Sequence, residues 1–115
     1  MKSHFAHGTV LSLAFAITAF FSGGASAFNE DAAKALAKKN DCTKCHAIDK
    51  DKKGPAYKKV AAKYKGKADA EEKLTKSITT GPKVKLPDGS EENHKIIDTK
   101  DAAEIKNLVQ WVLAQ

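Results

Sequence analysis

Two cysteines and a histidine with close spacing carry the most specific chemistry in this sequence, Cys42-x-x-Cys45-His46. This spacing is typical of covalent attachment of a c-type haem. Two thiols three positions apart can add to the two vinyl groups on one edge of a haem. The neighbouring imidazole can then bind the iron from one side. The motif therefore predicts one covalent haem c, with Cys42 and Cys45 as the thioether residues and His46 as the proximal axial iron ligand.

The same residues allow three other interpretations. A thioredoxin-like dithiol needs a strand before the motif, whereas a helical pattern precedes it here. A disulfide between Cys42 and Cys45 leaves His46 without a role. A zinc site has the correct ligand count, because the chain after residue 27 holds two cysteines and two histidines, His46 and His94. Adjacent Cys45 and His46, however, cannot easily both point at one tetrahedral metal, so haem attachment is favoured.

The first 27 residues have the pattern of a secretory signal peptide. An apolar run at residues 10–21 is followed by Ala-Ser-Ala at 25–27, a small-residue cleavage site. The run, about 12 residues, is too short for a comfortable membrane span, although an uncleaved anchor is the alternative. We expect residues 1–27 to be removed and residues 28–115 to form one domain in the bacterial periplasm. Export agrees with haem attachment, which takes place outside the bacterial cytoplasm.

The composition is basic and contains no arginine. The sequence has 20 lysines against 14 acids, a net charge of +6. The absence of arginine argues against phosphate or nucleic-acid recognition, where arginine forks are favoured. Residues 50–67 hold eight lysines and one acid, Asp51. Such a region can orient a protein toward acidic redox partners, and a merely solvated helix face is an equal alternative. We expect a monomer that has no membrane contact after signal cleavage.

The domain shows helical periodicity and no alternating strand pattern. Asn29 is a suitable cap for a helix that ends near Lys39, just before the haem motif. Further helices are expected from Pro55 to Gly66, over residues 69–80, and after a cap at Asp98 or Thr99. Residues 81–97 contain two prolines and an Asp-Gly pair, which predicts a long loop. A loop of this length in a small domain usually has a function.

Together these features resemble the small monohaem class I cytochromes c of bacteria, of the short electron-shuttle type. The resemblance implies an all-α fold in which about four helices pack around one covalently bound haem, with the first and last helices crossing near the haem edge. It implies one-electron transfer and no enzymatic activity. It also implies that the Pro55 carbonyl accepts the free N–H of His46. The matching segments are the helix before Cys42, Ala47-Ile48, Gly54-Pro55-Ala56-Tyr57, residues 60–64 and residues 108–113.

The far side of the iron departs from that family, whose distal ligand is normally a methionine in the loop before the last helix. The only methionine is Met1, so Met/His ligation is excluded once the signal peptide is removed. His94 lies about where the family's methionine would fall, and neutral imidazole is a good iron ligand. We therefore expect His94 to be the distal ligand, giving bis-histidine haem with a lowered potential. Asn93, a loop lysine or an open site remain alternatives.

The distal ligand also decides between two functions. A permanently six-coordinate haem suits a one-electron carrier. If the bond to His94 is weak or dissociable, the protein would instead be a haem-based binder or sensor of small gases such as NO or CO.

Overall fold

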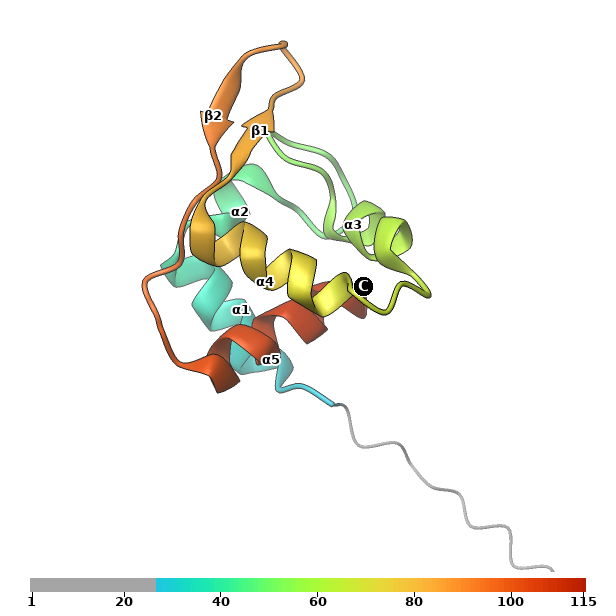
Figure 1. Ribbon diagram of the computed structural model, residues 1–115, viewed down its shortest axis with the longest axis vertical. Coiled ribbons are helices and arrows are strands. Elements are labelled where there is room, and N and C mark those ends of the chain that lie inside the picture. Colours follow the sequence, from blue (N-terminus) through green and yellow to red (C-terminus); the bar gives the residue numbers. More distant parts are fainter. Residues whose placement is uncertain (1–26) are drawn as a thin grey trace, which may run out of the picture.

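The computed structural model describes residues 27–115 (Figure 1). Residues 1–26, nearly the whole of the expected signal peptide, lie outside the described residues. No helix of the described part is long and apolar enough to cross a membrane. The helices are α1 (Glu30–Lys39), α2 (Cys42–Cys45), α3 (Tyr57–Tyr64), α4 (Ala70–Thr80) and α5 (Ala102–Leu113), and a hairpin is formed by β1 (Lys83–Lys85) and β2 (Glu91–Asn93). The predicted all-α class is confirmed, and α2 is a single turn added to the four expected helices.

Helices α1 and α5 cross at the base of the molecule (Figure 1). The buried face of α1 consists of Ala33 and Ala37, both with 0% exposure, and such small side chains allow the two helices to approach closely. The side chain of Asn107 on α5 holds both backbone groups of Asn29, accepting from its N–H at 2.6 Å and donating to its carbonyl at 2.9 Å. The Asn29 side chain in turn caps α1 by accepting the Ala32 N–H at 2.9 Å.

Helix α5 lies at the centre of the apolar core, because α1, α3 and α4 all pack against it. Its side chains Leu108, Val109, Trp111 and Val112 are buried. Trp111 meets Tyr57 of α3 edge-on, with ring centroids 5.3 Å apart, an arrangement that aromatic quadrupoles favour. Trp111 is thus a core residue, as its helical spacing indicates.

The segment 81–97, expected to be a loop, contains the two-stranded hairpin. Lys83 pairs with Asn93 and Lys85 with Glu91. The connecting turn uses Gly89 in the left-handed region (φ 87°), and the Asp88 carboxylate accepts the Ser90 N–H at 2.9 Å. In Figure 1 the hairpin projects from the helices at the end opposite α5. Its strands are only three residues long and mostly charged and exposed. They therefore lack the apolar alternation that predicts a strand.

The last helix begins two to three residues later than expected, because Asp101 and not Asp98 or Thr99 is its cap. The Asp101 carboxylate accepts the N–H groups of Ala103 at 2.8 Å and Glu104 at 3.3 Å. Thr99 holds the capping residue in place, because its hydroxyl accepts the Asp101 N–H at 3.1 Å.

Replacing this cap should destabilise the domain without changing its cavity. Asp101→Ala leaves two N–H groups of α5 without their acceptor and should lower the free energy of unfolding by about 1 kcal/mol, as measured by denaturant titration. Asp101→Asn keeps a good capping oxygen and should lose only a few tenths of a kcal/mol. Equal losses in the two variants would show that the capping bonds do not stabilise α5.

Candidate functional site

The Cys-x-x-Cys-His segment forms the short turn α2, which follows α1 after a sharp change of direction. Asp41 makes the change with a left-handed backbone (φ 58°). Cys42 and Cys45 are both partly buried, and within residues 27–115 no disulfide joins them. Burial is the main cause that raises the pKa of the Cys42 thiol. The His46 N–H donates to the Cys42 carbonyl at 2.9 Å, and this hydrogen bond closes the turn.

The orientation of His46 is set by the loop that connects α2 to α3. Nδ1 of His46 lies 2.6 Å from the Pro55 carbonyl oxygen. A carbonyl can only accept, so Nδ1 carries the proton and Nε2 is left with a free lone pair. The Tyr57 ring stacks on the imidazole at 5.2 Å. Burial, the largest cause, lowers the pKa of His46 and favours the neutral form that binds metals.

Gly54 allows this close approach of the loop to the imidazole. A Cβ at Gly54 would lie 2.5 Å from Cε1 and 2.9 Å from Nδ1 of His46, distances that no side chain tolerates. The Gly54 N–H also donates to the Cys45 carbonyl at 2.7 Å, which ties the loop directly to the cysteine turn.

His94 faces His46 from the end of the hairpin. It follows β2 directly, and its N–H donates to the Pro82 carbonyl at 2.8 Å. Its Nδ1 lies 3.0 Å from the Lys95 carbonyl, so this imidazole too has its Nδ1 occupied and its Nε2 free. The two ring centroids are 6.1 Å apart, with an angle of 41° between the ring planes. The structure thus brings together both histidines that the sequence singled out.

An apolar cavity of about 420 Å³ opens between these two histidines. It reaches from the cysteine turn across α3 to α4, α5 and the hairpin. A haem is a large apolar disc with an iron at its centre, and an apolar cavity with two opposed imidazoles and an adjacent thiol fits that group. Its apolar lining is formed by Pro55, Tyr57, Val60, Tyr64, Leu74, Ile78, Val84, Leu108, Val109 and Val112, together with Cys42.

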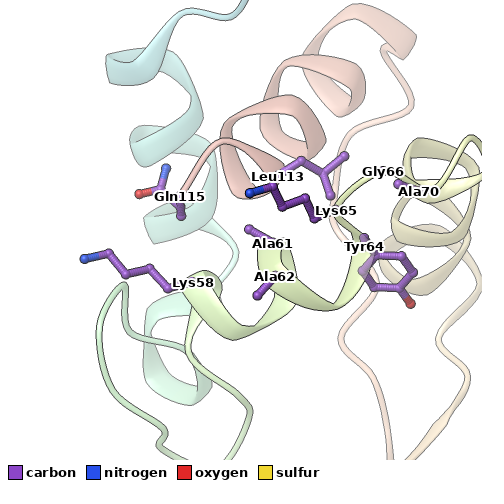
Figure 2. Close-up of a pocket in the computed structure, with 9 residues that line it drawn as sticks. All are labelled: Lys58, Ala61, Ala62, Tyr64, Lys65, Gly66, Ala70, Leu113 and Gln115. Atoms are coloured by element: carbon purple, nitrogen blue, oxygen red, sulfur yellow. The ribbon is translucent and has the colours of Figure 1, made fainter.

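A second hollow, about 510 Å³, lies on the other side of α3 near the C-terminus (Figure 2). Its lining includes the small side chains Ala61 and Ala62, and Figure 2 shows Lys58 at one end and Lys65 between Leu113 and Gln115. It contains no histidine, cysteine or carboxylate side chain. The chemistry of the chain is therefore concentrated in the cavity between the two histidines.

The competing interpretations of the motif lack the geometry they need. Among residues 27–115, no group of three or more His, Cys, Asp or Glu side chains is arranged to hold a metal ion, which argues against zinc. A helix and not a strand precedes the motif, which argues against a thioredoxin-like dithiol.

Sequence reasoning missed Asn40, a polar residue with only 2% exposure at the end of α1. Its side-chain nitrogen donates to the Leu36 carbonyl at 3.0 Å, and its side-chain oxygen accepts the Asp98 N–H at 2.8 Å. Asn40 therefore joins the start of the cysteine motif to the chain four residues beyond His94. An asparagine after a helix is an ordinary C-cap signal, so its long-range partner could not be foreseen.

Comparison with known proteins agrees with the site. The cytochrome c family matches residues 30–115. Cytochrome c-551 of Allochromatium vinosum is 39% identical over 83 residues, covering 68% of this chain and 80% of that protein. Cytochrome c-552 of Hydrogenobacter thermophilus is 37% identical over 79 residues, covering 69% and 76%. The crystal structure of Class 1 cytochrome MtoD from Sideroxydans lithotrophicus ES-1 superposes with a TM-score of 0.74 at 58% identity, covering 76% of this chain and 97% of that one.

These relatives are small electron carriers, and nothing in the comparisons favours a gas sensor. The match extends over all the helices and includes the cysteine motif, the proline loop and the last helix. The chain belongs to the cytochrome c family, as a small monohaem class I member whose cofactor is one covalently bound c-type haem.

Proposed function

We propose that the protein is a periplasmic one-electron carrier whose haem iron is bound by two histidines, His46 and His94. The observation that carries this proposal is the pair of neighbouring imidazoles, with ring centroids 6.1 Å apart and each with Nδ1 held by a backbone carbonyl. Haem c supplies an iron that gains and loses one electron without bond chemistry by the protein. The protein's part is to attach the haem, to hold both axial ligands and to exclude water.

Cys42 and Cys45 are the proposed thioether residues, and His46 the proposed proximal ligand. The hydrogen bond from Nδ1 to Pro55 fixes the ring and makes it a stronger donor to the iron. The stacked Tyr57 ring restricts rotation of the imidazole. These two contacts hold the imidazole in one orientation, which keeps rearrangement small when the oxidation state changes.

The distance between the histidines supports His94 as the distal ligand. Two metal–nitrogen bonds of about 2 Å, together with the centroid-to-nitrogen distance of about 1.1 Å in each ring, place the centroids of two trans imidazoles about 6 Å apart. The observed distance of 6.1 Å agrees with that arrangement. The competing residues Asn93 and Lys95 are exposed, whereas His94 is partly buried and lines the cavity.

Exchange of the usual methionine for histidine has a consequence for the potential. Methionine–histidine ligation raises the potential in cytochromes c. Imidazole is the better donor to ferric iron, so the protein should have a lower reduction potential than methionine-ligated members of its family. An electron carrier needs no catalytic side chain, and we propose that this protein is not an enzyme.

Export and cleavage after Ala27 complete the proposed maturation. The apolar run and the Ala-Ser-Ala site support a cleaved signal peptide. Relatives such as cytochrome c-551 are typically periplasmic. The mature protein is then residues 28–115, proposed to act as a monomer.

The lysine-rich region 50–67 is the proposed docking surface for acidic redox partners. Lys59 and Lys63 lie at the rim of the haem cavity, where a partner must approach for electron transfer. Part of the charge is neutralised within the protein, since Lys53 pairs with Glu92, Lys58 with Asp49 and Lys59 with Asp51. These exposed pairs are weak, and the region keeps an excess of lysines that can steer association.

Removing the distal ligand tests the proposal directly. His94→Ala should convert the ferric haem from low-spin to high-spin, and ferrous protein should bind CO with an affinity higher on the order of a hundredfold. That factor corresponds to an open form populated at about 1% in the unmodified protein. The measurement is CO titration followed by absorption spectroscopy.

Asn93→Ala and Lys95→Ala are the matched controls, because they alter the neighbours that could ligate instead. Both should remain low-spin and resist CO. A low-spin His94→Ala protein, or a high-spin Lys95→Ala or Asn93→Ala protein, would contradict ligation by His94.

The close approach of Gly54 to His46 predicts that a larger residue at position 54 disturbs the haem site. Gly54→Ala should push its new methyl group into the His46 ring, cost about 1–3 kcal/mol of unfolding free energy and change the haem absorption spectrum. Gly89→Ala is the control: its strained backbone (φ 87°) should cost a similar amount, but its Cβ meets nothing within 4 Å. Denaturant titration and visible spectra check both. An unchanged Gly54→Ala spectrum would contradict the proposed role of His46.

The docking surface predicts a salt-dependent rate with an anionic oxidant. Oxidation of the ferrous protein by hexacyanoferrate(III) should slow as ionic strength rises. Lys63→Gln should lower the rate at low salt by about two- to threefold. Lys106→Gln, on the exposed side of α5 and outside the cavity lining, should leave it unchanged. Equal effects of the two substitutions would show only the influence of net charge.

A further inference from the structure

We propose that Asp51 is a positioning residue for His46, acting on the haem iron through a single peptide group. The inference rests on the proposed role of His46 as proximal ligand. It assigns a function to the one acid in the lysine-rich region 50–67, which would otherwise be read as an interruption of a basic surface.

A single peptide unit connects Asp51 to His46. The Pro55 carbonyl, which accepts from Nδ1 of His46 at 2.6 Å, and the Ala56 N–H belong to the same planar group. In a trans peptide these two bonds point in opposite directions, and their dipoles are aligned and add. The Ala56 N–H donates to Oδ1 of Asp51 at 2.8 Å. The carboxylate therefore holds one end of the peptide group whose other end holds the imidazole.

This arrangement affects both geometry and polarity. Rotation of the peptide group away from His46 would break the bond to Asp51 as well, so the carboxylate fixes the direction of the Pro55 carbonyl. A charged acceptor on the N–H also polarises the group and makes its carbonyl oxygen a stronger acceptor. A stronger bond gives the His46 ring more imidazolate character, which stabilises ferric iron and lowers the potential.

The fold holds Asp51 for this role from three sides. Its backbone forms an isolated antiparallel bridge with His46, and the Lys52 N–H donates to the Gly54 carbonyl at 3.0 Å. Its second carboxylate oxygen pairs with Lys59 of α3. The loop between α2 and α3 thus folds back on itself. This brings the Asp51 carboxylate to the backbone N–H of Ala56, the residue that follows Pro55 and precedes α3.

Asp49 provides a matched control in the same loop. It is also an exposed acid two residues away, and it also pairs with a lysine of α3, Lys58. Unlike Asp51, it accepts no backbone N–H among the hydrogen bonds of residues 27–115. Substitution at Asp49 therefore removes the same charge near the haem without touching the peptide group.

The experiment compares Asp51→Ala, Asp51→Asn, Asp49→Ala and Asp49→Asn in the haem-loaded protein. The first measurement is hydrogen exchange of the His46 Nδ1–H by NMR, and the second is the reduction potential. Asp51→Ala should accelerate exchange on the order of tenfold, the factor for loss of about one hydrogen bond. Its potential should rise more than that of Asp49→Ala. Asp51→Asn keeps an oxygen acceptor and should fall between wild type and Asp51→Ala in exchange.

Two results would overturn the inference. Equal exchange in Asp51→Ala and Asp49→Ala, or equal rises in potential, would reduce Asp51 to an ordinary surface charge. A purely structural role would lower stability and leave both measurements at the Asp49→Ala values. Failure of the proposed function is separable, because it would appear in the wild-type protein as a His46 Nδ1–H without the hyperfine shift of an iron ligand.

Discussion

The opposition of two imidazoles across an apolar cavity is the constraint on which the structure depends. His46 and His94 are far apart in the sequence, yet their ring centroids lie 6.1 Å apart, and three contacts tie together the segments around them. Asn107 locks α1 against α5, the Pro55 loop returns to the cysteine turn, and Asn40 holds the chain beyond His94. The first contact joins α1 to α5. The second joins the Pro55 loop to His46, and the third joins the end of α1 to the chain after His94.

The hairpin leads directly into His94, the residue proposed to bind the iron in place of the family's methionine. Its strands are mostly charged and exposed, with only Val84 partly buried at the cavity, so burial contributes little to holding them in place. Backbone pairing does so instead, with Gly81 ending α4 in the left-handed region and the Pro82 carbonyl accepting the His94 N–H. The ion pair of Lys53 with Glu92 connects the loop between α2 and α3 to the hairpin. The two sides of the proposed iron site are therefore coupled through charged residues at its edge.

Much of the fold could be predicted from the sequence because helical periodicity and caps are local signals. Asn29 and Gly81 mark helix boundaries that the structure confirms, whereas α3 begins at Tyr57, two residues after Pro55, and ends at Tyr64, before Gly66. The short strands were missed because each has only three residues, two of them charged, which is too few to show a strand pattern. The cap at Asp101 was not predicted, because Asp98, Thr99 and Asp101 are all suitable capping residues. Only the folded backbone shows that Asp101 caps the helix. Long-range contacts of Asn40 and Asp51 depend on tertiary structure and have no signature in the sequence.

The ferric wild-type haem offers the most direct test of the central claim. Near-infrared magnetic circular dichroism separates histidine–histidine from histidine–methionine and histidine–lysine ligation by the energy of one charge-transfer band. Ligation by His46 and His94 predicts a low-spin ferric spectrum with the band of two imidazoles. A high-spin spectrum, or the band of an imidazole paired with a lysine amine, would contradict it.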